Sequence, residues 1–152
     1  YAHRNKIIHC DIKPDNMILL SDGRLQLTDF GIAKVAQRTI VKTMIASGSG
    51  TVGYMAPEQA MGRPSARSDV FAIGLIMYKI LTGVLPEWPF QWPMPGITSL
   101  RRKAHPALIH VIQKTLEMRP AHRYRDANEL LRAFRFVKTR SIKFARKKKA
   151  KS

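Results

Sequence analysis

One stretch of the chain constrains the fold more than any other, a helix whose apolar residues are not confined to a single face. Between residues 68 and 81 apolar side chains recur at helical spacing, and Gly83 follows as a C-cap. They are Val70, Phe71, Ile73, Ile76, Met77, Ile80 and Leu81. A helix that is apolar on several sides must be covered there by other elements. The sequence therefore predicts a mainly helical domain built around this helix.

Shorter apolar runs near the N-terminus have the length of strands. We expect three short strands at residues 7–8, 17–20 and 25–27, the last two joined by a turn at Asp22-Gly23. The turn signal predicts that these two strands form a hairpin. The predicted fold class is therefore α+β and mainly α-helical.

The second half of the chain alternates between helix-breaking and helix-forming segments. Residues 86–96 contain four prolines and should cross the surface as an extended segment. One further helix is expected from His105 to Met118. Another should begin at Asp126, because Asp126 and Glu129 have the spacing of a capping box ahead of an apolar run.

Composition limits the class of protein. A chain of 152 residues with 45% hydrophobic content fits one globular domain. No run of about 18 apolar residues occurs, and the first residues lack the apolar core of a signal peptide. A single cysteine, Cys10, excludes an internal disulfide. These features predict a cytoplasmic setting, with membrane tethering only if a transmembrane segment follows Ser152.

The positive charge is concentrated at the C-terminal end. The chain carries 27 basic and 10 acidic residues, a net charge of +17, and residues 132–152 contain ten of the basic residues and no acid. We therefore expect a domain over residues 1–137 and a basic low-complexity tail over residues 138–152. Three interpretations of the tail are open: weak salt-dependent contact with polyanions, contact with an anionic membrane, or a solvated tail.

Three short motifs follow one another in a fixed order. They are His9-Cys10-Asp11-Ile12-Lys13-Pro14-Asp15-Asn16, then Thr28-Asp29-Phe30-Gly31, then Tyr54-Met55-Ala56-Pro57-Glu58. In this order they resemble the catalytic loop, the DFG motif and the APE motif of protein kinases. The resemblance extends from Tyr1 to about Val137 and implies the C-terminal lobe of a protein kinase, with the short strands lying around the catalytic loop. It implies a serine/threonine kinase that transfers the γ-phosphate of ATP to hydroxyl groups of a protein substrate.

The resemblance assigns roles to the polar residues of these motifs. Asp11 would accept the proton of the substrate hydroxyl, and Lys13 would balance charge on the transferring phosphate. Asn16 and Asp29 would bind Mg²⁺, which prefers oxygen ligands, and so hold ATP. Thr51 matches a threonine that ties the peptide-binding loop to the catalytic aspartate. Lys13 and Thr51 together favour serine/threonine specificity.

Four further residues have structural roles by the same resemblance. His9 would pack and hydrogen-bond the catalytic loop. Glu58 is expected to form a buried bidentate ion pair with Arg123. Asp69, at the start of the central helix, would accept hydrogen bonds from catalytic-loop amides.

The chain also departs from the kinase pattern. Cys10 replaces an arginine that in many kinases pairs with a phosphorylated loop residue, so we expect activity to depend little on such phosphorylation. The sequence contains no Gly-rich nucleotide loop and no lysine in the strand context that kinases use to bind ATP phosphates. We therefore expect the isolated chain to be inactive. The G-x-G-x-x-G run at residues 48–53 belongs to the activation segment. Two alternatives remain, a pseudokinase or binding scaffold, and, less favoured, a basic nucleic-acid-binding module.

Overall fold

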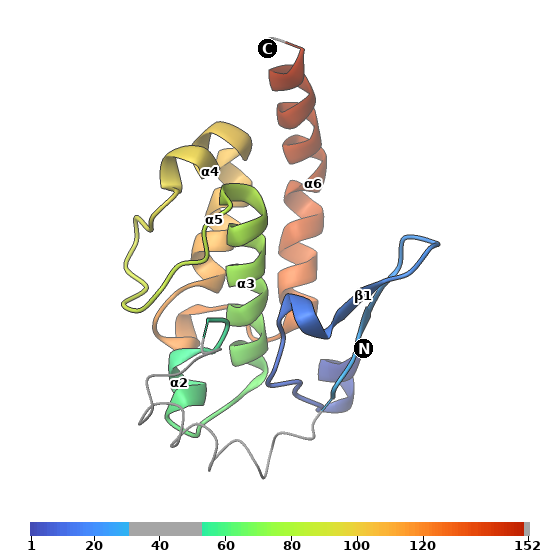
Figure 1. Cartoon of the computed structure of the whole chain (residues 1–152), viewed down its shortest axis with the longest axis vertical. Coiled ribbons are helices and arrows are strands. Elements are labelled where there is room, and N and C mark those ends of the chain that lie inside the picture. Colours follow the sequence, from blue (N-terminus) through green and yellow to red (C-terminus); the bar gives the residue numbers. More distant parts are fainter. Residues whose placement is uncertain (31–52, 151–152) are drawn as a thin grey trace.

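Helices packed around one buried helix form most of the molecule. The computed structural model describes residues 1–30 and 53–150. The central helix is α3 (Ala66–Thr82), which packs against α4 (Ile97–Lys103), α5 (Pro106–Thr115) and α6 (Ala127–Lys149) (Figure 1). Phe71, Leu75 and Tyr78 of α3 have no exposed surface. The predicted fold class is confirmed, and its central helix is the one that the apolar pattern indicated.

Local signals fix both ends of α3. Ser65 caps the N-terminus, since its Oγ accepts from the Arg67 N–H while Ser68 Oγ accepts from the Ser65 N–H. At the C-terminus Gly83 has φ 82° and donates its N–H to the Lys79 carbonyl. This left-handed conformation costs glycine little. The caps hold the helix in a fixed register against its neighbours.

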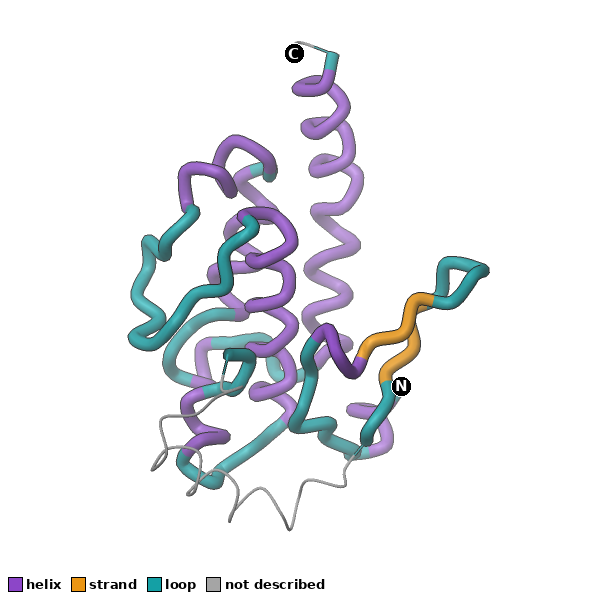
Figure 2. Tube along the Cα trace, viewed as in Figure 1, coloured by secondary structure: helices purple, strands orange, loops and turns teal. Residues whose placement is uncertain are grey.

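The N-terminal region contains a two-stranded sheet. Strands β1 (Met17–Leu19) and β2 (Leu25–Leu27) pair antiparallel, with Met17 opposite Leu27, and form the hairpin seen in Figure 2. The prediction of a strand at residues 7–8 was wrong. Those residues lie between the 3₁₀ helix η1 (Ala2–Asn5) and the catalytic loop, and they pair with no strand in the described residues. Two apolar residues alone offer too few ladder hydrogen bonds to add a strand.

The segment between α3 and α5 differs from expectation in one respect. Residues 84–95 cross the surface without regular structure, as their prolines predict, and Phe90 and Met94 are buried against the core. The short helix α4 that follows was not predicted. It begins after Gly96, which has φ 87°, and it buries only Leu100 completely, so the sequence has no apolar periodicity there.

Helix α5 begins as predicted, with His105 as its cap, but ends earlier, at Thr115. The 3₁₀ turn η3 (Pro120–His122) leads on to α6. Asp126 Oδ1 accepts from the Glu129 N–H at 2.8 Å, but the predicted reciprocal bond is wrong, because the Glu129 carboxylate accepts from the Arg125 N–H instead. Helix α6 continues through Lys149, so the basic tail is helical over most of its length.

The cap of α6 predicts a pH-dependent contribution to stability. Its hydrogen bond to the Glu129 N–H holds the pKa of Asp126 below the ordinary value of 3.8. A lowered folded pKa means that this stability is present above the ordinary pKa and is lost as the pH falls through the folded pKa. We expect Asp126→Ala to lower the free energy of unfolding by about 1 kcal/mol at neutral pH. Urea titrations near pH 7 and pH 3 should show that the difference in unfolding free energy between the variant and the original chain is smaller at pH 3. An equal difference at both pH values would contradict the prediction.

The close contact between α3 and α5 depends on a glycine. A Cβ atom at Gly74 would lie 2.1 Å from Oγ1 and 2.8 Å from Cβ of the buried Thr115. Gly74→Ala should therefore destabilise the fold by about 1–3 kcal/mol, although alanine normally favours a helix. Chemical denaturation measures this change. The prediction fails if Gly74→Ala is as stable as the original chain.

Candidate active site

A buried carboxylate fixes the predicted catalytic loop to the central helix. Asp69 lies in the first turn of α3 and is 2% exposed. Its Oδ2 accepts from the His9 N–H and its Oδ1 from the Cys10 N–H, each at 2.8 Å. The loop backbone next to Asp11 is thus held by the most buried helix of the molecule.

The side chain of His9 links the loop to the end of strand β2. Its Nδ1 accepts from the Asp11 N–H at 3.2 Å, so the ring proton lies on Nε2, which donates to the Thr28 carbonyl at 2.9 Å. The ring also packs against Phe30, with ring centroids 4.6 Å apart. Both ring nitrogens are therefore used in holding the loop.

Asp11, Lys13 and Asn16 converge on one point of this loop. The 3₁₀ turn η2 (Pro14–Asn16) folds the chain back, so that Asn16 Nδ2 donates to the carbonyl and to Oδ2 of Asp11, at 2.8 and 2.9 Å. Lys13 Nζ lies 3.0 Å from the same Oδ2. The Asp11 side chain is 43% exposed. One carboxylate is thus held by two donors from its own loop and still reaches the surface.

Asp29 lies at the same end of the hairpin as Asn16. The Thr28 N–H donates to the Asn16 carbonyl at 3.0 Å, which joins the residues before β1 to those after β2. Asp29 has φ 59°, an uncommon conformation for a residue other than glycine, and accepts from Thr28 Oγ1 at 3.2 Å. Strained backbone of this kind clusters at functional sites.

The oxygen atoms of this pair suit a hard divalent cation. Asn16 uses its amide nitrogen for both bonds to Asp11, and this leaves its Oδ1 able to bind a cation. No group of three or more His, Cys, Asp or Glu in the described residues could hold a metal ion. Asn16 and Asp29 supply oxygen atoms of the kind that Mg²⁺ binds in proteins.

Cys10 occupies a conformation that the sequence did not indicate. It is 5% exposed, has φ 67°, and its carbonyl accepts a hydrogen bond from the side-chain amide of Gln59 in α2 (Pro57–Ala60). Gln59 was not singled out in the sequence. A polar residue next to a proline-led helix start carries no signal that it will be buried against a distant loop. Thr51 lies outside the described residues.

His3 is a second residue that sequence reasoning missed. Its Nδ1 accepts from the Ala127 N–H at 2.9 Å, and its Nε2 donates to Asp69 Oδ2 at 2.8 Å. The side chain is only 6% exposed. His3 thus connects the start of α6 to the carboxylate that holds the catalytic loop.

Removing the hydrogen bonds of His3 should lower the stability of the fold. We expect His3→Ala to lower the free energy of unfolding by about 1–3 kcal/mol, because it leaves the Ala127 N–H without that acceptor. The matched control is His122→Ala, an exposed histidine, which should change stability by less than about 0.5 kcal/mol. Equal effects in urea denaturation would argue against the link.

The structure brings Glu58 and Arg123 together in the interior. Arg123 Nη1 lies 2.7 Å from Glu58 Oε1, and Nη2 lies 3.0 Å from Oε2. Ser68 Oγ also donates to Glu58 Oε1, at 2.7 Å. The pair joins α2 to the segment before α6.

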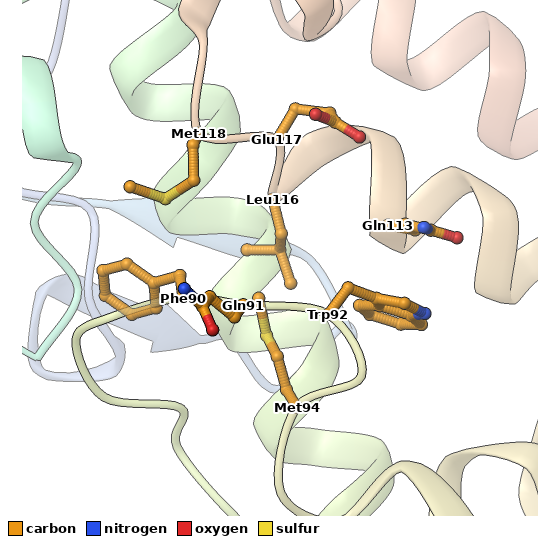
Figure 3. A pocket seen from close by; sticks show the side chains of 8 residues that line it. All are labelled: Phe90, Gln91, Trp92, Met94, Gln113, Leu116, Glu117 and Met118. Atoms are coloured by element: carbon orange, nitrogen blue, oxygen red, sulfur yellow. The ribbon is translucent and has the colours of Figure 1, made fainter.

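The pocket in Figure 3 is separate from this site. It has a volume of about 310 Å³ and lies between the proline-rich segment, with Trp92 and Met94, and the end of α5, with Leu116. None of its lining residues is among the candidate catalytic or metal-binding residues. It therefore belongs to the packing of the helical half of the molecule.

Comparison with known proteins agrees with the order of the motifs. A model of the protein kinase domain matches residues 1–134. The chain belongs to the protein kinase family, and the resemblance inferred from its motifs is confirmed.

Three similar proteins come from bacteria. Serine/threonine-protein kinase PknA of Nostoc sp. is 38% identical over 88% of this chain, and serine/threonine-protein kinase C of Synechocystis sp. is 38% identical over 86%. Serine/threonine-protein kinase PrkC of Bacillus subtilis is 32% identical over 86% of the chain. The chain spans 25%, 26% and 22% of the lengths of these three relatives.

Of the helices in residues 1–30 and 53–150, none combines the length and the apolar character needed to cross a bilayer.

Proposed function

We propose that this chain forms the catalytic and metal-binding part of a protein serine/threonine kinase that transfers the γ-phosphate of ATP to hydroxyl groups of a protein. The observation that carries the proposal is the cluster of Asp11, Lys13 and Asn16, with Asp29 beside it at the base of the hairpin. Phosphoryl transfer requires positioned charges more than covalent chemistry, and this cluster supplies them. The relatives are named as serine/threonine kinases, which supports the same specificity.

Each side chain has a proposed part in the reaction. Asp11 accepts the proton from the substrate hydroxyl, since its carboxylate is both exposed and oriented by Asn16. Lys13 donates to the transferring phosphate once that group lies beside Asp11, and so compensates its charge. Asn16 and Asp29 would hold Mg²⁺, which when bound neutralises charge on the ATP phosphates. Thr51 is proposed to tie the peptide-binding loop to Asp11.

The setting of the reaction is proposed as cytoplasmic, where ATP is available. The main alternative is a pseudokinase that keeps the fold as a binding scaffold. Retention of Asp11, Lys13, Asn16 and Asp29 favours the enzyme, because a scaffold does not require these groups together. The two functions differ in whether phosphate is transferred.

A transfer assay tests the proposal. In a protein that joins this chain to an ATP-binding N-terminal lobe, radiolabelled ATP with Mg²⁺ should label a protein substrate, and hydrolysis of the product should yield phosphoserine or phosphothreonine. The chain alone should give no transfer, because it contains no Gly-rich loop or strand lysine to hold the nucleotide beside this cluster. Nucleotide binding by the joined protein without any transfer would favour the scaffold instead, and phosphotyrosine would contradict the specificity.

A further inference from the structure

The backbone immediately before Asp11 has an unusual conformation. Cys10 has φ 67°, in the left-handed region that residues other than glycine seldom adopt. The residue is 5% exposed, so this conformation lies in the interior and not in a surface turn. Such a conformation persists only where surrounding contacts hold it. Because Cys10 precedes Asp11 directly, the contacts that hold it also determine how the chain enters Asp11.

Two helices hold the backbone of Cys10, one at each end of the residue. Its N–H donates to Asp69 Oδ1 of α3, at 2.8 Å. Its carbonyl accepts from the side-chain amide of Gln59, which belongs to α2. The φ and ψ angles of Cys10 relate these two backbone groups to each other. Hydrogen bonds to both groups therefore stabilise the left-handed conformation between α3 and α2.

The hydrogen bond from Gln59 also acts on the peptide group that joins Cys10 to Asp11. Gln59 binds the carbonyl oxygen of this group, and His9 Nδ1 accepts from its N–H at 3.2 Å. A peptide group is planar, so hydrogen bonds at both of its edges oppose its rotation. The Cα atom of Asp11 is attached to this group. The direction of the Asp11 side chain therefore depends on the bond that Gln59 makes.

Gln59 is held in place by the interior of the molecule. It is 6% exposed, and a buried amide requires a hydrogen-bond partner. Ala56, at the start of α2, has no exposed surface. Glu58, the residue before Gln59, forms the ion pair with Arg123. The amide that binds the Cys10 carbonyl thus comes from an anchored helix.

We propose that Gln59 is a positioning residue for phosphoryl transfer, whose amide holds the Cys10–Asp11 peptide group in the conformation that directs the Asp11 carboxylate toward the substrate hydroxyl. This inference rests on the proposed kinase function, in which Asp11 accepts the hydroxyl proton. Gln59 acts through the loop backbone and contacts neither ATP nor substrate in this role. A misplacement of about 1 Å at a reacting group can lower a rate about 100-fold.

The conformation of Cys10 in the 152-residue chain tests the contact without any need for activity. NMR chemical shifts and three-bond couplings report its φ angle. Gln59→Met keeps the length of the side chain and removes the donor, so the left-handed conformation of Cys10 should lose population. Gln91→Met is the matched control, because it removes an exposed amide from the proline-rich segment. A left-handed Cys10 that persists unchanged in Gln59→Met would overturn the proposal.

Turnover measures the consequence for the reaction. In a protein that joins the chain to an ATP-binding lobe, Gln59→Met should lower kcat by about 10- to 100-fold and leave the KM for ATP unchanged. Gln59→Asn should behave alike, because its amide is one methylene shorter and does not reach the carbonyl. It also provides a second variant if Gln59→Met does not fold. Gln91→Met should keep the original kcat.

A second substitution separates positioning from a general loss of stability. In the Cys10→Gly background, Gln59→Met should lower kcat by a smaller factor, because glycine adopts a positive φ without a contact that holds it. A merely structural role of Gln59 would lower the melting temperature without this dependence on Cys10. Equal factors in both backgrounds would therefore contradict the positioning role.

The two measurements distinguish this inference from the proposed function. If the original joined protein transfers no phosphate, the kinase function fails, and the NMR result still determines whether Gln59 holds the peptide group. If it transfers phosphate and folded Gln59→Met has the same kcat, the positioning role is overturned while the kinase function stands.

Discussion

Asp11→Asn is expected to reduce turnover by about 10²- to 10⁴-fold in a protein that joins this chain to an ATP-binding lobe. The amide keeps the volume of the carboxylate but cannot accept the substrate proton. Asn16 Nδ2 and Lys13 Nζ both lie within 3.0 Å of Asp11 Oδ2, and the amide oxygen of the variant can accept from them in its place. The variant should therefore bind ATP normally and fail in the chemical step, which pre-steady-state phosphate transfer measures.

Asp29→Asn should cause a loss of similar size for a different reason. It removes charge from a proposed Mg²⁺ ligand, so the concentration of Mg²⁺ needed for half-maximal activity should rise. Asp22→Asn is the matched control, because Asp22 is an exposed aspartate whose hydrogen bonds, among residues 1–30 and 53–150, are to Arg24 in the hairpin turn. Normal activity of the Asp11 or Asp29 variant would disprove that residue's proposed role. A loss of fold, seen as a lowered melting temperature, would instead indicate a structural role.

The sequence predicted the elements whose signals are local and strong. Helix α3 combined apolar residues on several faces with Gly83 at its end, and a glycine at that position could be recognised without knowledge of its neighbours. The hairpin had a turn signal between two strands of matching length. Such elements are specified by nearby residues, and tertiary contacts reinforce them.

Elements that depend on distant contacts were not predicted. Helix α4 is held by one fully buried side chain, Leu100, and follows a run of prolines, so it has no periodic pattern. Residues 7–8 looked like a strand, but a strand requires a partner, and the nearest strands pair with each other. Tertiary packing determines whether such segments form a helix or a strand, and the local pattern of a single sequence does not reveal that packing.

The candidate site shows the same division. The resemblance of the motifs to those of kinases indicated Asp11, Asn16 and Asp29, which lie in or next to short loops. His3 and Gln59 gave no such signal, since they act through long-range hydrogen bonds, His3 with Asp69 and the Ala127 N–H, and Gln59 with the Cys10 carbonyl. A lone polar residue beside apolar neighbours resembles any surface residue until the fold places it.

Glu58→Gln is expected to lower the free energy of unfolding by about 3–5 kcal/mol. The substitution keeps the shape of the side chain, and its carbonyl oxygen can still accept from Ser68 Oγ. It leaves the guanidinium of Arg123, whose side chain is 0% exposed, without a counterion in the interior. An uncompensated buried charge is among the largest single costs that a substitution imposes.

Arg123 makes more hydrogen bonds than Glu58. Besides the ion pair, it donates to the carbonyls of Glu117, Met118 and Arg67. Arg123→Lys keeps the charge but loses the planar fork that makes these bonds together, so it should also destabilise, by about 1–3 kcal/mol. Replacing both partners by apolar residues should not restore full stability, because the three carbonyls would then lose their donor.

A surface pair provides the comparison for these measurements. Arg125 and Glu129 also form an ion pair, at 3.4 Å, but the Arg125 side chain is 70% exposed. Arg125→Gln should therefore cost less than about 1 kcal/mol, since water compensates the lost charge. Guanidinium also screens the surface ion pair, which should reduce its already small contribution. Titrations in guanidinium and in urea should therefore rank the variants in the same order of stability. If Glu58→Gln costs no more than Arg125→Gln, the buried pair does not stabilise the fold as its geometry implies.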